Sequence, residues 1–184
     1  VTVLAVTLEE SGLLGSAYFG ENPLIPLEKI VAGINIDTMQ PTGPAKDVVV
    51  VGAGASQLED TLKAVLAESN RVIRPDPSPQ NGYFYRSDHI SLAKKGVPML
   101  YVDSGIDLIE GGEAAGEAAG KKYTDDNYHK PSDEYADDWN LAGIEADVKV
   151  DYEIVNRLAN NGERPNWYDG NEFKALRDAQ RKGQ

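Results

Sequence analysis

Two adjacent glutamates, one aspartate and one histidine are the residues of this chain best suited to chemistry. Glu9 and Glu10 follow the apolar run 1–8, and Asp37 ends a second apolar run. His129 is one of only two histidines and follows the acidic segment 125–127. Neighbouring side chains that leave an extended strand point in different directions, so one glutamate can bind a metal ion while the other faces a substrate. Carboxylate and imidazole together are a donor set that zinc accepts.

Each of these residues also has a simpler interpretation. Acidic side chains stabilise a helix N-terminus through the helix dipole, and the glutamate pair taken alone is better explained in that way. A single loop histidine is usually structural. Spacing along the chain does not show whether the four side chains converge.

The scaffold that must position these residues is predicted to be a single α/β domain. Apolar runs predict strands at 1–8, 30–37, 47–51, 72–73 and 97–102, and helices are predicted at 11–18, 88–95 and 140–160. Ser56 and Glu59 form a capping box that opens a further helix, with Leu58, Leu62, Val65 and Leu66 on one face. Strands that alternate with helices indicate a sheet covered on both faces, and sites in such sheets gather at the carboxyl ends of strands.

The remaining segments are predicted from composition and periodicity. The run 1–8 is nearly all apolar, which is typical of a strand buried on both faces, so we expect a domain that is N-terminally truncated. Segment 110–122 is rich in glycine and alanine and is predicted to be a mobile loop. Helix 140–160 is expected to bury one face of apolar side chains, which are Leu141, Ile144, Val148, Val155 and Leu158. We divide the chain into a domain at 1–160 and a polar tail at 161–184, held to the surface by Trp167 and Tyr168.

Charge and cysteine content exclude several classes of function. The chain has 18 basic and 30 acidic residues, for a net charge of −12, and it has no cysteine. An acidic surface keeps a protein soluble; it also repels nucleic acid and anionic membranes and attracts metal ions and free amino groups. Without cysteine, disulfides and thiolate zinc sites are excluded, so a transition metal requires histidine and carboxylate ligands. No apolar run is long enough to span a membrane.

Four separated motifs, in this order, resemble metallopeptidase family 28. They are TLEESGLLGS at 7–16, NID at 35–37, RSDH at 86–89 and YHKPSD at 128–133. The resemblance extends from residue 1 to about residue 158. It implies a zinc exopeptidase-like fold, a three-layer α/β/α sandwich with a mostly parallel or mixed central sheet. It also implies two zinc ions and removal of N-terminal residues from peptides.

The resemblance also implies roles for individual residues. Glu9 is similar to the general base that activates the metal-bridging water. Glu10 and His129 resemble ligands of one zinc ion, and Asp37 resembles a ligand of the other. Tyr128 is similar to the tyrosine that donates a hydrogen bond to the developing oxyanion.

The RSDH motif is expected to lie in the substrate pocket or just behind the metal ligands. Arg86 is a candidate for binding a substrate carbonyl or carboxylate. Ser87, Asp88 and His89 resemble the turn next to the family's site, and plain helix capping is an equally good interpretation of this turn.

The chain departs from the family pattern at two ligands. The family takes one histidine ligand and the metal-bridging aspartate from segments upstream of the glutamate pair, and nothing precedes Val1 here. We therefore expect this fragment to be inactive alone, with partial or no zinc occupancy. The unpaired edge of its first strand is expected to favour self-association. A secreted or periplasmic parent that acts on peptides with a free N-terminus is the family expectation.

Three other interpretations of the sequence are open. Segment 48–54 imitates a strand that enters a dinucleotide-binding loop, but Gln57 and Arg74 stand where that motif needs a glycine and an acidic residue. A glutaminyl-cyclase-like acyltransferase or a non-catalytic binding domain would share the fold; the glutamate pair and Tyr128 favour a peptidase. An inert scaffold fragment is the third.

Overall fold

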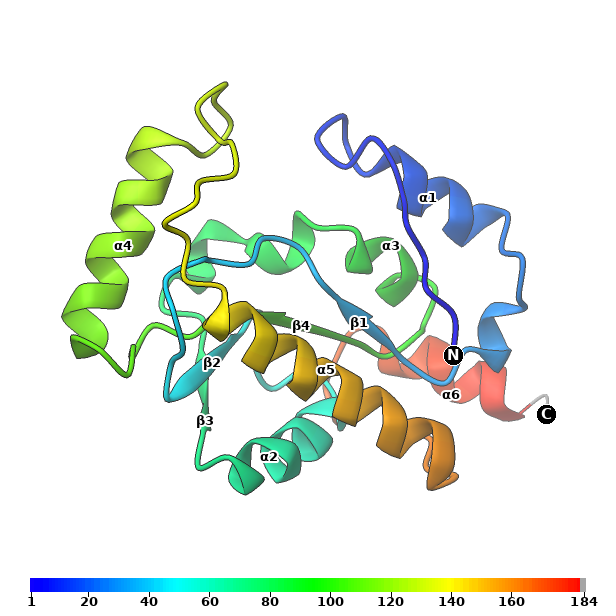
Figure 1. Cartoon of the computed structure of the whole chain (residues 1–184). Coiled ribbons are helices and arrows are strands. Elements are labelled where there is room, and N and C mark those ends of the chain that lie inside the picture. Colours follow the sequence, from blue (N-terminus) through cyan, green and yellow to red (C-terminus); the bar gives the residue numbers. More distant parts are fainter. Residues whose placement is uncertain (183–184) are drawn as a thin grey trace.

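A mixed four-stranded sheet lies at the centre of the molecule (Figure 1). The computed structural model describes residues 1–182. The strands are β1 (Gly33–Asn35), β2 (Asp47–Val50), β3 (Val72–Pro75) and β4 (Met99–Asp103), in the order β1-β4-β2-β3. β1 runs parallel to β4 and β2 runs parallel to β3, whereas β2 and β4 are antiparallel. The predicted α/β class with a mixed central sheet is confirmed.

Helices cover both faces of the sheet, because successive residues of a buried strand point to opposite sides. One face packs against α2 (Leu58–Glu68) and α5 (Ala142–Asn160) through a core that includes Leu100. Its neighbour Met99 belongs to a second core on the other face, together with α3 (His89–Ala93). The helices α1 (Leu14–Glu21) and α6 (Lys174–Lys182) complete the outer layers, with 3₁₀ turns at Leu27–Lys29, Pro79–Asn81 and Tyr83–Tyr85.

The start of α2 differs in detail from the predicted capping box. The Glu59 carboxylate accepts hydrogen bonds from the backbone N–H groups of Gly54 and Ala55, at 2.8 Å each to Oε1. Its distance to the Ser56 nitrogen is 3.5 Å. The Ser56 hydroxyl accepts from the Leu58 N–H at 3.4 Å rather than from the Glu59 N–H that a capping box uses. The predicted buried face of α2 is confirmed.

The predicted strand at 1–8 is wrong. The segment forms no strand, and Val1 and Val3 are 94% and 92% exposed. A strand requires a hydrogen-bonding neighbour, and this segment pairs with none of the described strands. Its last residues instead bind the start of α1, since Gly15 donates to the Thr7 carbonyl at 2.9 Å. A Cβ at Gly15 would lie 2.3 Å from that same oxygen, so only glycine permits this contact.

The predicted mobile loop at 110–122 is also wrong. It belongs to helix α4 (Gly112–Asp126), none of whose residues is buried. Alanine, glutamate and lysine are strong helix formers, so the segment is helical without a core to pack into. Lys121 and Lys122 each pair with an aspartate four residues later, at 2.5 Å, which adds local support.

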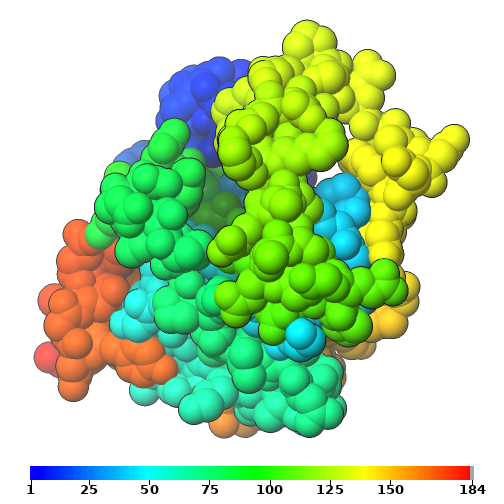
Figure 2. All heavy atoms as spheres, turned by 90° about the vertical axis from the view of Figure 1, so that its left-hand side faces the viewer, coloured from blue at the N-terminus to red at the C-terminus, as the bar shows by residue number. Residues whose placement is uncertain are grey.

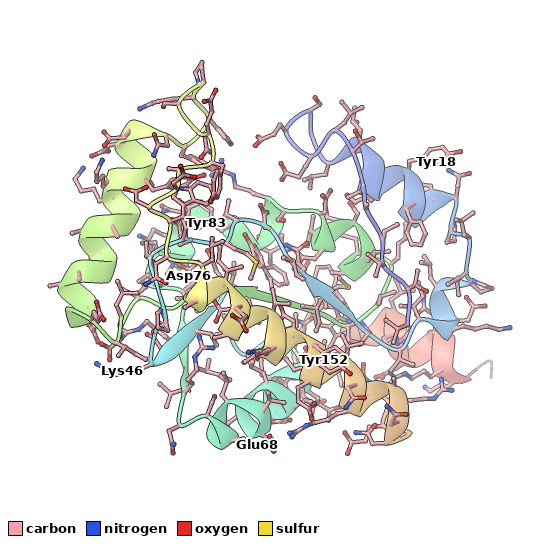
Figure 3. The ribbon with its side chains drawn as sticks, viewed as in Figure 1. Tyr18, Lys46, Glu68, Asp76, Tyr83 and Tyr152 are labelled. Carbon is pink, nitrogen blue, oxygen red and sulfur yellow. The ribbon has the colours of Figure 1, made fainter. Side chains whose placement is uncertain are left out.

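The predicted stripe on α5 is wrong in part: Leu158 packs against the core, but other predicted members do not. Leu141 and Val148 are each 45% exposed, and Tyr152 also faces outward (Figure 3). The buried positions are Gly143, Asp147, Val150, Asp151 and Ile154. A buried ion pair decides this orientation, because Asp147 accepts from Arg71 at 2.6 Å. No helix of the described chain, residues 1–182, is long and apolar enough to cross a membrane.

The C-terminal segment packs more deeply than a polar tail would. Trp167 is 1% exposed, and its indole N–H donates to the Gly96 carbonyl at 3.1 Å. Arg177 in α6 is also buried and donates to the carbonyls of Leu27 and Ile30. The segment therefore ties the α3–β4 connection to the chain before β1.

Candidate active site

The structure brings Glu10 and His129 into direct contact. The Nε2 atom of His129 lies 2.7 Å from Oε1 of Glu10, although 118 residues separate them in the sequence. Their side chains are 53% and 71% exposed. The His129 ring stacks on Tyr128 with ring centroids 3.9 Å apart. Two loops that face each other at one edge of the molecule supply these groups (Figure 1).

Glu9 lies in the same turn as Glu10. Leu8 and Leu13, which flank this turn, both have positive φ angles, 59° and 60°. Leucine seldom adopts this conformation, so the turn that presents the glutamates is strained. Burial raises the pKa of Glu9, and the nearby charges of Asp37, Glu10 and Asp88 raise it further.

Asp37 is held by side chains from the sheet and from the turn before α3. Its Oδ2 accepts a hydrogen bond from the Ser87 hydroxyl at 2.6 Å and one from the Tyr101 hydroxyl at 3.4 Å. Ser87 in turn accepts from the Asn35 amide at 2.8 Å. Ser87 and Asn35 are both buried, so this carboxylate is oriented from behind.

Ser87 and Asp88 do not cap α3 through their side chains, so the capping interpretation is wrong. Ser87 orients Asp37 instead, and the charge of Asp88 acts on Glu9. His89 is 1% exposed and packs between the rings of Phe84 and Tyr101, at centroid distances of 4.9 and 5.1 Å. Burial lowers the pKa of His89 to about 4, so this imidazole is neutral and forms part of the floor beneath the site.

Tyr128 and Arg86 bring a phenol and a cation to the same region. Partial burial raises the pKa of Tyr128, and the charges of Glu10, Asp37 and Glu9 raise it further, while Arg86 acts in the opposite direction. A phenol that keeps its proton can donate a hydrogen bond. The Arg86 guanidinium carbon lies 5.7 Å from the ring centroid of Tyr83.

The surface is hollowed between helix α4 and the green segment around residues 80–90 (Figure 2). This segment carries Arg86, and the loop after α4 carries Tyr128 and His129. Within residues 1–182, no hydrogen bond or ion pair engages the Arg86 guanidinium, which lies over the Tyr83 ring.

Sequence reasoning missed Asn35 and Tyr101. Asn35 stands in the NID motif, and an amide at the end of an apolar strand needs a partner when buried, which was the available signal. The sequence around Tyr101 gave no such signal, because Tyr101 and its partner Asp37 are 64 residues apart in the chain.

The donors present suit zinc in kind but fall short in number. Glu10 and His129 touch and can share one ion, whereas Asp37 is bound to Ser87 and Tyr101. In the part of the chain that the structure describes, no three His, Asp or Glu side chains are grouped closely enough to hold a metal. Catalytic zinc usually has three protein ligands. These residues alone therefore do not make a complete zinc site.

Comparison with known proteins gives one match. The family model described as Peptidase family M28 matches residues 1–152, which covers all the site residues above. No curated protein and no solved structure gives a significant match.

Proposed function

We propose a function from the premise that this chain belongs to peptidase family M28, a family of zinc-dependent peptidases. The chain is thus a peptidase by family, and we propose that it is an aminopeptidase that releases N-terminal residues. The contact between Glu10 and His129, with Glu9 and Tyr128 beside it, carries this proposal. It brings together one basic carboxylate, one phenolic donor and two zinc-type ligands.

Glu9 is the general base in this proposal. A carboxylate whose pKa is raised accepts a proton from the attacking water and can pass it to the leaving amine. Tyr128, which keeps its proton, donates a hydrogen bond to the oxyanion that develops on the scissile carbonyl. Asn35 and Ser87 hold Asp37 in one orientation. Zinc, when bound by Glu10, His129 and Asp37, supplies Lewis acidity and acidifies water.

The charges around the site favour a substrate with a free N-terminus. Glu9, Glu10, Asp37 and Asp88 lie together in a chain of net charge −12, which attracts a protonated α-amino group. Arg86 is the cation on the opposite wall, and it suits a carbonyl or carboxylate farther along the peptide. N-acetylated peptides should therefore be poor substrates; equal turnover of free and blocked peptides would contradict exopeptidase action.

The number of donors limits what this chain can do alone. We infer that two zinc ions require ligands beyond Glu10, Asp37 and His129, and that the isolated chain binds zinc weakly and hydrolyses peptides poorly. Elemental analysis and a peptidase assay on the 184-residue chain test this. Tight binding of two zinc ions with full activity would contradict it.

Self-association through the β1 edge is a further proposal for the isolated chain. β1 pairs only with β4 among the described strands, and the exposed apolar residues Val1 and Val3 lie in the N-terminal segment. Unpaired strand edges recruit other chains. Light scattering should detect a species larger than one chain, and a monomer at all concentrations would contradict this.

The decisive experiment uses a form of the protein that carries a full ligand set and hydrolyses aminoacyl anilides. Glu9→Gln should keep its zinc and lose about 10²–10⁴-fold in rate, the usual contribution of a general base. Glu145→Gln, which removes an exposed carboxylate on α5, is the matched control and should keep full activity. Retained activity in Glu9→Gln would remove Glu9 from the mechanism.

Glutaminyl cyclisation is the alternative that the same experiment can reveal. If an N-terminal glutaminyl peptide is converted to a pyroglutamyl peptide while no peptide bond is cleaved, the acyltransferase interpretation replaces the peptidase one. Release of free glutamine from that peptide supports the aminopeptidase.

A further inference from the structure

A second hollow, of about 390 Å³, lies between the C-terminal segment and the start of α2. All of its lining residues except Gln57 lie beyond the residues that match the family. The C-terminal segment runs beside the chain around residue 57, since the backbones of Gln57 and Asn166 hydrogen-bond at 2.8 Å. Figure 2 shows this orange segment at the opposite end of the face from the blue turn that carries the glutamates. The hollow is therefore separate from the candidate active site.

Three cationic side chains line this hollow: Arg164, Lys174 and Arg181. The guanidinium of Arg181 is fixed in place, because it donates to the carbonyls of Arg164 at 3.1 Å and Pro165 at 2.7 Å. Its Nε atom is buried and has no hydrogen-bond partner. Lys174 is held by Asp178 at 2.8 Å. The fold thus positions Arg181 and Lys174, whereas Arg164 is exposed to solvent.

Positive charge here stands out against the rest of the chain. The whole chain carries −12, yet residues 161–182 contain five basic and four acidic residues. No hydrogen bond or ion pair engages the Arg164 side chain anywhere in 1–182. Burial lowers the pKa of Arg181, and the nearby charge of Arg164 lowers it further. Two guanidinium groups therefore repel each other without an anion between them. Asp169 is the one acid in the lining; it lies 3.7 Å from the Lys174 ammonium, and its side chain is fully exposed at 101%.

We propose that this hollow binds a phosphate group through Arg164, Arg181 and Lys174. A phosphate monoester carries close to two negative charges and three acceptor oxygens, which suits three cations better than a singly charged carboxylate does. Guanidinium groups bind phosphate oxygens in a planar, two-pronged arrangement. Gln57 also lines the hollow and adds an amide donor.

The ligand can be free phosphate or the phosphate of a small organic molecule. The hollow is larger than one inorganic anion needs, and Tyr168 in its lining offers a ring beside the cations. We therefore expect a phosphomonoester with a flat organic group to bind more tightly than inorganic phosphate. The ring stacks on the phenol in this arrangement, whereas inorganic phosphate has no such contact.

Isothermal titration calorimetry with inorganic phosphate and with phenyl phosphate, at constant ionic strength set with chloride, tests the site. We expect saturable binding of both, tighter for phenyl phosphate. Arg164→Gln should weaken it by about tenfold or more, because it removes a charge-assisted hydrogen bond. Lys122→Gln, on exposed helix α4, removes the same charge elsewhere and should leave binding unchanged.

Two outcomes would overturn the proposal. One is a heat of titration that does not saturate with phosphate and that chloride also produces, which would show general screening of charge and no specific site. The other is equal weakening by Arg164→Gln and Lys122→Gln, which would show a response to net charge alone. Lys174→Gln is the second variant if Arg164→Gln does not fold, and it should weaken binding in the same way. The test does not depend on peptidase activity.

Discussion

The sheet with its covering helices and the face that carries the candidate site are built differently. In the first region, Leu58, Leu62 and Ile154 are fully buried. In the second, Glu10 and His129 are more than half exposed, and helix α4 buries none of its residues. Packing stabilises the first region, while local hydrogen bonds and helix propensity hold the second. Stability and chemistry are thus assigned to different parts of the molecule.

The boundary between the two regions passes through the site itself. Asp37 belongs to the packed side, since buried Ser87 and Asn35 hold it. Glu10 and His129 belong to the exposed side, and their contact bridges two loops. One prospective ligand is therefore preorganised by the core, and the other two depend on how the loops are held. Three pairs of substitutions test this division.

The largest expected effect is a difference in stability between substitutions at the chain's two tryptophans. Trp167→Ala removes a buried ring and its hydrogen bond to Gly96, and should lower the free energy of unfolding by about 3–5 kcal/mol. Trp139, on the loop that follows the site, is half-buried and meets the Tyr135 ring edge-on. Trp139→Ala should cost about 1 kcal/mol or less. Urea unfolding measures both, and equal losses would break the division.

A smaller effect, dependent on pH, is expected at Asp151. Burial, with the neighbouring charge of Asp147, raises the pKa of Asp151 to about 7. The folded state therefore binds this proton more tightly than the unfolded state does, whose aspartates titrate near pH 4. Stability is fully present below about pH 4, falls as the pH rises toward 7, and then stays low.

Asp151→Asn removes the charged form and should flatten this dependence. We expect a gain on the order of 2–4 kcal/mol at pH 8 and almost none at pH 4. Chemical denaturation at both pH values measures it. Asp125→Asn on exposed α4 is the control for removal of one negative charge. A gain at Asp151 that is the same at both pH values would refute burial of the charge as the cause.

The smallest effect on stability is expected at His129. Its contact with Glu10 is exposed, and such pairs contribute about 0–1 kcal/mol. His129→Ala should therefore change the free energy of unfolding of the metal-free chain by less than about 1 kcal/mol, whereas buried His89→Ala should cost more. If His129→Ala lowers the free energy of unfolding as much as His89→Ala does, the site loops contribute to stability as the core does. The contrast between the two regions is then wrong.

The periodicity of the sequence was enough to predict the elements that form the core. Strands β2 and β4 and the buried face of α2 were predicted because continuous apolar runs and a 3.6-residue period report burial directly. The segment 1–8 has the same apolar character and is not a strand, because pairing depends on a neighbour that lies elsewhere in the chain. Helix α4 was missed because small side chains were taken to mean disorder, although alanine is the strongest helix former.

By itself, the sequence determined the class of fold, the family, and which residue types are available for chemistry. Only the tertiary structure decided that Glu10 meets His129, that Ser87 orients Asp37, and that α5 turns Asp147 toward Arg71. These contacts join residues 50 to 119 positions apart in the sequence. Local propensity and periodicity report the burial of an element but not its neighbour. Buried polar groups must find partners across the whole chain, and this requirement fixes the neighbours of Asn35, Ser87 and Asp147. The contact between Glu10 and His129 is exposed and depends instead on how two loops are held.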